Sequence, residues 1–410
     1  VQRKMAREAR NDKEGRPVVY NTSGINVAEL KVDEAATEAK IVKMYPAHDA
    51  QPIENAADGT DVAVICDVTA FHAEGGGQLG DIGTITASTG VIAVNVTKKL
   101  PDGAVIMIGA VTEGTVAVGD AVTFAVDKAR KMDIARNHTA THLLHAALKQ
   151  VLGAHVNQAG SYVGPDRLRF DFSHFSQLTA EELKEVEAIV NEQVLAGKAV
   201  NIEELPIEEA KKKGATALFG EKYGNIVRVV TVPDFSMEFC GGSHVSNTAQ
   251  IGMFKIVSEG SSGAGVRRIE AVTGHGAVAH VNATEEMVNG LAAELKCRCC
   301  DVPTRLEALQ CELKAAQKKA EELAAEIAKA QVSNVADQKV NADSVDALRN
   351  LGDQMRDKVG GVVVLAAVMG EKVSILTMAT KDAVAKGVHA GNIVKAVAKL
   401  CGGGGGGRQD

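Results

Sequence analysis

The sequence predicts a mixed α+β protein with a small β-barrel-like subdomain, an α+β core, a coiled-coil helical arm and a small α/β domain. Three observations predict this order: short β-rich runs in the first third, alternating helical and strand patterns in the middle, and a long heptad repeat after them. The expected boundaries are 40–127 for the β-rich part, 128–276 for the core, 280–332 for the arm and 340–410 for the last domain, with a linker region at 1–39.

The β-rich part contains short runs of β-branched residues, at 62–68, 91–96 and 105–108, separated by Gly, Asp and Pro turns. This pattern is typical of a small barrel or sandwich. Within it lies the segment FHAEGGGQ at 71–78. Its three consecutive glycines allow the backbone to approach a ligand or another chain closely.

The core is expected to mix helices with strands. Helical patterns cover 135–152 and 179–196, and a capping box of Thr179 and Glu182 opens the second of them. Strand patterns cover 167–172, 227–232 and 252–258. These elements predict an α+β domain.

After the core, apolar residues recur with 3,4 spacing over about three and a half heptads, which predicts a helical arm with an a/d seam. The seam packs either against a helix at 284–296 of the same chain or against a second copy. Beyond it, helices at 345–359 and 390–400 flank strands at 361–369 and 373–377. The glycine tract at 402–407, before Arg408, is either a linker or a backbone-rich anion cradle. The seam residues are Leu306, Leu309, Leu313, Ala316, Ala320, Leu323, Ile327 and Ala330.

Composition limits the class of protein. A net charge of −7 argues against a protein that coats nucleic acid by phosphate neutralisation, so we expect any RNA contact to be local. The longest apolar run, at 362–369, is far too short to span a membrane, and no secretory signal is present at 1–11. Seven cysteines without paired spacing indicate a reduced, cytoplasmic protein, and the two ends of the sequence suggest a fragment. Three basic groups could touch RNA: Lys128, Arg130, Lys131 and Arg136; 211–213; and Arg267 with Arg268.

Two histidine- and cysteine-containing motifs predict a metal site. His138 and His142 stand at i and i+4 of a predicted helix, so both imidazoles project from one face. About a hundred residues later, Cys240 and His244 flank two glycines that let the backbone curl around one ion. Three nitrogens and one sulfur form a typical tetrahedral ligand set for a single Zn²⁺. His145, on the same helical face, is a rival ligand or a partner of the ligands.

The sequence argues against a zinc protease, because Thr139 stands where HExxH has its glutamate. A second metal site is not expected. The cysteines at 297, 299, 300 and 311 are close in sequence but lack a histidine or a second CxxC to complete four ligands.

Four motifs together resemble alanyl-tRNA synthetase. They are RNHTATH at 136–142, RFDFSH at 169–174, CGGSH at 240–244 and RRIEAVTG at 267–274. The resemblance covers almost the whole chain: 1–39 is similar to the end of the tRNA-recognition helices, 40–276 to the editing domain, and the rest to the helical arm and C-terminal domain. The family's aminoacylation domain is missing. Ser243 stands where the family usually has Thr, and we expect little effect because the hydroxyl is kept.

The resemblance implies a zinc-containing editing core that hydrolyses Ser-tRNA and Gly-tRNA mischarged for alanine, with tRNA(Ala) as partner. It also implies that Gln158 lies near the metal and that Thr69 hydrogen-bonds the serine hydroxyl, next to Gly76 and Gly77 of the glycine loop. A homodimer through the arm and the C-terminal domain is a further expectation. Four simultaneous ligands leave zinc no open position, so the ion either activates water after losing or adding a ligand or orients the tRNA end while another group positions water. We favour orientation.

Three alternatives stay open. Threonyl-tRNA editing shares both metal motifs, although the glycine loop and the glycine tract favour the alanyl system. A free-standing trans-editing deacylase would carry the same residues. In the third alternative, the zinc ion only stabilises the fold, and the chain is a noncatalytic module that binds tRNA or forms oligomers.

Overall fold

The computed structural model describes residues 18–216, 224–333 and 342–408, and is of mixed α+β class with several antiparallel sheets. The chain divides into two compact units, 1–286 and 287–410. Among the residues described, every helix is too short or too polar to traverse a lipid bilayer. Residues 1–17 of the expected tRNA-recognition segment, 1–39, lie outside the described residues.

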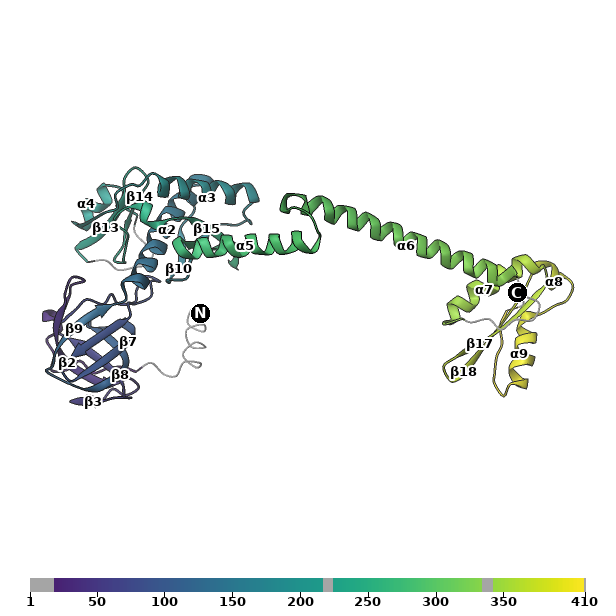
Figure 1. Cartoon of the computed structure of the whole chain (residues 1–410), viewed down its shortest axis with the longest axis horizontal. Helices are drawn as coiled ribbons and strands as arrows, with labels where there is room; N and C mark the ends of the chain where they lie inside the picture. Colours follow the sequence, from purple (N-terminus) through teal and green to yellow (C-terminus); the bar gives the residue numbers. More distant parts are fainter. Residues whose placement is uncertain (1–17, 217–223, 334–341, 409–410) are drawn as a thin grey trace. The chain divides into compact units, whose positions relative to one another are not determined.

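The first unit begins with a seven-stranded antiparallel sheet that closes on itself, because β7 pairs with β8 as well as with β6 (Figure 1). Two bulges in the β7–β8 ladder accompany this closure, as expected where a sheet bends and twists strongly. Gly109 lies where the two strands cross most closely: a Cβ there would lie 1.8 Å from the Ala93 carbonyl oxygen. Buried Ile41, Val64 and Met107 help to fill the interior. The strands are β2 (Glu38–Pro46), β3 (Asn55–Ala57), β4 (Asp61–Cys66), β6 (Gly83–Ala87), β7 (Gly90–Lys99), β8 (Val105–Ala117) and β9 (Ala121–Val126).

A long helix, α2 (Lys128–Leu152), follows this sheet and enters the core of the first unit. It starts seven residues before the predicted position because the Asp127 side chain accepts a hydrogen bond from the Arg130 backbone amide and caps it. Most of its residues from Ile134 to Leu148 are buried. Packing on all sides therefore holds the part of the helix that carries the two predicted histidine ligands.

Two antiparallel sheets and a second helix surround α2. The four-stranded sheet has the order β10-β11-β16-β15, and the three-stranded sheet has the order β12-β13-β14. The predicted capping box of Thr179 and Glu182 is present at the start of α3. The bounds are β10 (Gln158–Val163), β11 (Leu168–Ser173), α3 (Ala180–Leu195), β12 (Asn201–Pro206), α4 (Ile207–Lys212), β13 (Ile226–Val232), β14 (Ser236–Phe239), η2 (Thr248–Ile251), β15 (Phe254–Gly263) and β16 (Val266–Thr273), with the short η1 (Val27–Glu29), β1 (Lys31–Val32) and β5 (Val68–Thr69) nearer the N-terminus.

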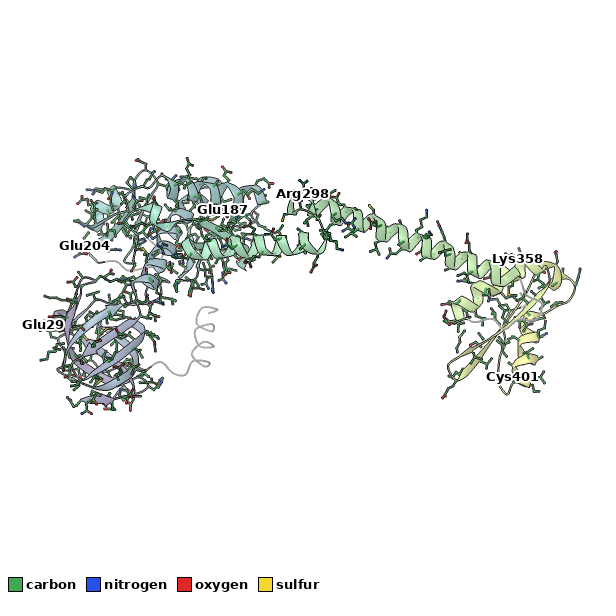
Figure 2. The ribbon with its side chains drawn as sticks, viewed as in Figure 1. Glu29, Glu187, Glu204, Arg298, Lys358 and Cys401 are labelled. Carbon is green, nitrogen blue, oxygen red and sulfur yellow. The ribbon has the colours of Figure 1, made fainter. Side chains whose placement is uncertain are left out.

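The second unit contains the predicted arm helix, α6 (Val302–Ser333), which follows α5 (Gly274–Glu294) and η3 (Cys299–Asp301). The helix is confirmed. Of the two partners considered for its seam, the helix at 284–296 does not cover it in the described part of the second unit. Figure 2 shows side chains standing out along α6. Within the second unit, Leu306, Leu313, Leu323 and Ile327 are 46% to 59% exposed.

The end of the described chain has the predicted α/β pattern. Helix α7 (Val345–Val359) packs Leu348, Leu351 and Met355 against one face of the hairpin of β17 (Val362–Met369) and β18 (Lys372–Ala379). Gly370, at a φ of 62°, turns the hairpin. The remaining helices are α8 (Lys381–Ala385), which the pattern missed, and α9 (Ala390–Leu400).

Candidate metal centre

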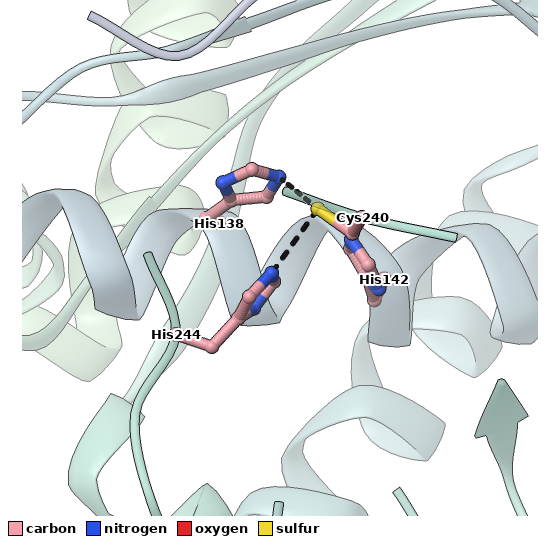
Figure 3. Close-up of side chains that lie close together, drawn as sticks. All are labelled: His138, His142, Cys240 and His244. Carbon is pink, nitrogen blue, oxygen red and sulfur yellow. Dashed lines mark hydrogen bonds between the residues drawn. The ribbon is translucent and has the colours of Figure 1, made fainter. Parts of the chain in front are cut away.

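The four predicted ligands meet at one point in the first unit (Figure 3). His138 and His142 come from α2, Cys240 follows directly after β14, and His244 lies in the loop that leads to η2. Their ligand atoms all lie within 4.8 Å of one another, and the Cys240 Sγ atom lies 3.3 Å from Nε2 of both His138 and His244. The cluster has the ligand chemistry to bind a metal ion such as zinc.

The outer nitrogen of His138 contacts a buried amide. Nδ1 lies 2.5 Å from Oε1 of Gln78, which also accepts a hydrogen bond from the Ser243 backbone amide at 2.9 Å. The Gln78 Nε2 group points the other way and donates to the Ser243 hydroxyl at 3.2 Å. Oε1 is thus an acceptor, so His138 carries its proton on Nδ1 and keeps a lone pair on Nε2.

The other two imidazoles show the same arrangement. His244 Nδ1 lies 3.1 Å from the Thr139 hydroxyl, whose own proton is donated to the Ala135 carbonyl oxygen. His142 Nδ1 lies 3.6 Å from Oε2 of Glu238. All three rings therefore have an oxygen atom on the Nδ1 side, within hydrogen-bond distance for His138 and His244 but at the longer 3.6 Å for His142, which makes no hydrogen bond through Nδ1 to any described residue. Three lone pairs and a thiol turned toward one another repel unless a cation or a shared proton lies among them, so the donor set fits a bound cation.

The electrostatics of the cluster favour metal binding. Burial raises the pKa of the Cys240 thiol, but the electrostatic effects of His138 and His142 and their hydrogen bonds to the sulfur outweigh it and leave this pKa well below the usual value. Burial, and to a smaller extent the electrostatic effect of the neighbouring His138, lower the pKa of His244 to about 3, which keeps this ring neutral. Burial opposes the charge on His142, yet Glu238 and the Cys240 thiolate raise its pKa to about 9. A thiol with a lowered pKa and a neutral imidazole are the forms in which these side chains bind a metal ion.

Two features fix the loop that carries Cys240. The Arg228 guanidinium donates to the carbonyl oxygens of Cys240 and Gly242, both at 2.8 Å. A Cβ on Gly242 would lie 2.1 Å from Cε1 of His138 and 2.7 Å from Oε1 of Gln78. A side chain at this position would therefore displace a ligand, whereas nothing lies within 4 Å of a Cβ on Gly241.

The glycine loop, 75–77, approaches a strand of its own chain. Gly77 has a φ of +89°, and a Cβ there would lie 2.4 Å from the Ser161 carbonyl oxygen of β10. The Val163 amide donates to the Gly77 carbonyl oxygen at 2.8 Å. The close approach predicted from the glycines is thus to β10, and it brings the adjacent Gln78 to His138.

A cavity of about 960 Å³ opens beside the metal ligands. Gln158 and Gly76 line it, as does Thr141, which stands between the two helix ligands. Thr69 lies elsewhere: it is 3% exposed, and its hydroxyl contacts the Met107 sulfur and the Phe71 amide, both at 3.2 Å. The roles predicted for Gln158, Thr69, Gly76 and Gly77 stay predictions.

The sequence analysis missed several residues of the site. Gln78 was noted only as the last residue of the glycine loop segment. Glu238 and Arg228 lie in strands, and nothing in a strand pattern distinguishes a residue that contacts a metal ligand from any other strand residue. His145, left open as a ligand, is not in the cluster; its Nδ1 lies 2.9 Å from Oε1 of Glu238. Thr141 had one local signal, its position between two ligands.

The amino-acid sequence matches two families of aminoacyl-tRNA synthetase domains. Residues 227–270, which include Cys240 and His244, match the family described as "Threonyl and Alanyl tRNA synthetase second additional domain". Residues 2–130 match "tRNA synthetases class II (A)". The chain thus carries a domain found as an addition to class II aminoacyl-tRNA synthetases.

Individual relatives narrow the class. The chain is 47% identical over 422 residues to alanine–tRNA ligase of Acetivibrio thermocellus, and 47% identical over 430 residues to that of Bacillus subtilis. These matches cover 99% and 100% of the chain but 48% of each relative, so the chain spans about half the length of the curated relatives it matches. The chain is related over its whole length to the alanyl-tRNA synthetases and corresponds to about half of one.

Proposed function

We propose that this chain hydrolyses tRNA(Ala) that has been mischarged with serine or glycine, as the editing part of an alanyl-tRNA synthetase. One observation carries the proposal: three members of the three-histidine, one-cysteine cluster, His138, His142 and Cys240, line a cavity of about 960 Å³. Binding cavities for small ligands span roughly 300–1,000 Å³, so this cavity has room for a terminal adenosine esterified with a small amino acid. A metal site that only stabilised the fold would not need a cavity beside it.

The residues present fit one Zn²⁺ held by His138, His142, Cys240 and His244. When bound, this ion would supply positive charge that orients the ester end of the substrate. Gln158 and Thr141 then offer polar groups inside the cavity that can position the ester and a water molecule. The Thr141 hydroxyl donates to the Asn137 carbonyl oxygen at 2.8 Å, so its lone pairs are the part left to meet a substrate hydroxyl.

This arrangement explains why the substrates would be small. A synthetase pocket shaped for alanine cannot exclude glycine by size, and rejects one added hydroxyl only weakly. A second site that reads the hydroxyl by hydrogen bonding can separate serine from alanine far better. Threonyl-tRNA editing is the less favoured alternative, because relatives matching 99–100% of the chain are alanine–tRNA ligases.

Deacylation assays on the 410-residue chain test the proposal. We expect Ser-tRNA(Ala) to be hydrolysed much faster than Ala-tRNA(Ala), and Cys240→Ala to abolish hydrolysis and to lower the zinc content. The matched control is Cys401→Ala, which removes an exposed thiol in the second unit. Full zinc content with no hydrolysis of either substrate would instead support the noncatalytic, zinc-stapled alternative. A free-standing deacylase differs from a synthetase segment only in the coding sequence upstream.

The exposed seam of α6 supports a second copy of this chain as partner. Leucine and isoleucine at heptad positions lose contact with water when two such helices pair. Sedimentation of wild type and of a Leu313→Lys, Leu323→Lys double variant tests this: a dimer that becomes a monomer supports the pairing, and a monomeric wild type contradicts it.

A further inference from the structure

The carboxylate of Glu238 is the feature of the site that the proposed chemistry leaves unused. Glu238 is 7% exposed, lies on β14 and precedes Cys240 by two residues. Its two oxygens face two histidines of α2: Oε2 lies 3.6 Å from Nδ1 of His142, and Oε1 lies 2.9 Å from Nδ1 of His145. A buried carboxylate is costly unless it is paired, so this placement needs a compensating role.

Glu238 differs from the two other groups behind the ligand histidines. Gln78 and Thr139 are neutral, and each also contacts other groups that hold it in place. Glu238 alone of the three brings a negative charge. Together with the thiolate of Cys240, it would offset the two positive charges of a bound zinc ion, so that the buried site is neutral as a whole.

His145 holds this carboxylate on the side away from the cluster. It is 3% exposed, and its Nδ1 hydrogen bond fixes one oxygen of Glu238 while the other faces His142. The imidazole is one turn of α2 away from His142, so both contacts come from one rigid helix. The carboxylate therefore has a defined position relative to the ring that it faces.

We propose that Glu238 is a positioning residue of the metal centre: its negative charge, 3.6 Å from Nδ1 of His142, holds the proton of this ring on Nδ1, keeps Nε2 turned toward the cluster, and raises the strength of His142 as a ligand. Carboxylates behind a ligand histidine act in this way in other metal sites, and their loss typically lowers metal affinity 10–100-fold. The inference rests on the metal centre of the proposed function, but concerns metal binding and not hydrolysis.

The test measures metal binding directly on the whole chain. Glu238→Gln keeps the size of the side chain and removes its charge, so we expect zinc affinity, measured by competition with a chelator, to fall 10–100-fold. The absorption bands of bound Co²⁺ should shift, because the field of one ligand changes. Glu203→Gln is the matched control: it removes an exposed carboxylate from β12 of the same sheet, and we expect no change in either measurement.

A purely structural role predicts a different result. The metal-free Glu238→Gln protein would then unfold at a lower temperature, while the folded protein kept the zinc affinity and Co²⁺ spectrum of wild type, and this outcome would overturn the proposal. If Glu238→Gln does not fold, Glu238→Asp keeps the charge but shortens the reach; its zinc affinity should be lower than that of wild type, and an equal affinity would refute us. If wild-type protein with full zinc content hydrolyses neither substrate, the proposed function is contradicted, but the inference about Glu238 and zinc binding is unaffected.

Discussion

Replacement of Gly242 by alanine tests the metal centre at its tightest point. The added methyl carbon would lie 2.1 Å from Cε1 of His138, whereas carbon atoms in contact are about 3.5–4.0 Å apart. Either the ring or the loop must therefore move by roughly 1.4 Å or more. Metal–ligand distances tolerate only about 0.2 Å, so we expect His138 to be lost as a full ligand.

The size of the effect follows from the cost of inserting a group into a packed site. Overpacking costs about 1–3 kcal/mol. Because about 1.4 kcal/mol corresponds to a tenfold change in an equilibrium constant, zinc affinity should fall by roughly 5- to 150-fold. Gly242→Ala should also slow the hydrolysis of Ser-tRNA(Ala) when zinc is limiting.

The neighbouring glycine provides the control. A Cβ on Gly241 meets nothing within 4 Å, so Gly241→Ala should bind zinc as wild type does. The assay is chelator competition, with thermal unfolding of the metal-free proteins measured in parallel. Equal zinc affinities for the two alanine variants would show that the loop does not press on His138, and the geometric argument would be wrong.

Three further predictions concern the surroundings of the site. Glu34 has its pKa lowered to about 2, chiefly by its hydrogen bond with His72, against an ordinary value of 4.5. The stabilisation that the ionised Glu34 carboxylate gives the fold is therefore complete above about pH 4.5 and is lost as the pH falls toward 2. In urea unfolding, the difference in free energy of unfolding between wild type and Glu34→Gln should shrink over this range. A constant difference would contradict the pairing of Glu34 with His72. Gly77→Ala should lower the unfolding temperature and weaken zinc binding, because the added Cβ would collide with the backbone of β10. Gly76→Ala is the control: this residue also has a positive φ but lies in open space, so the backbone strain should lower the free energy of unfolding by only about 1 kcal/mol. Thr141→Val should bind zinc normally but discriminate Ser-tRNA(Ala) from Ala-tRNA(Ala) at least about tenfold less well in deacylation assays, because a lost hydrogen bond to the substrate costs about 1.5 kcal/mol. Unchanged discrimination would show that another residue contacts the serine hydroxyl.

Local sequence patterns were sufficient to predict which four residues cluster as candidate ligands, and to predict much of the secondary structure. The spacing of His138 and His142 has one geometric meaning in a helix, and the two glycines between Cys240 and His244 allow a tight loop. The capping box at Thr179 and the helix at Val345–Val359 were also predicted from neighbouring residues alone. Such features depend on contacts within a few residues, which a sequence displays directly.

Only the tertiary structure decided what surrounds the ligands. Gln78 reaches His138 from 60 residues away because the glycine loop packs on β10, and Glu238 meets His142 because β14 lies beside α2. The cavity, the buried position of Thr69 and the exposed seam of α6 likewise depend on how distant segments pack. A helix or a short loop fixes the relative positions of its own residues, but the partner behind each ligand is set by long-range packing that residue spacing does not encode.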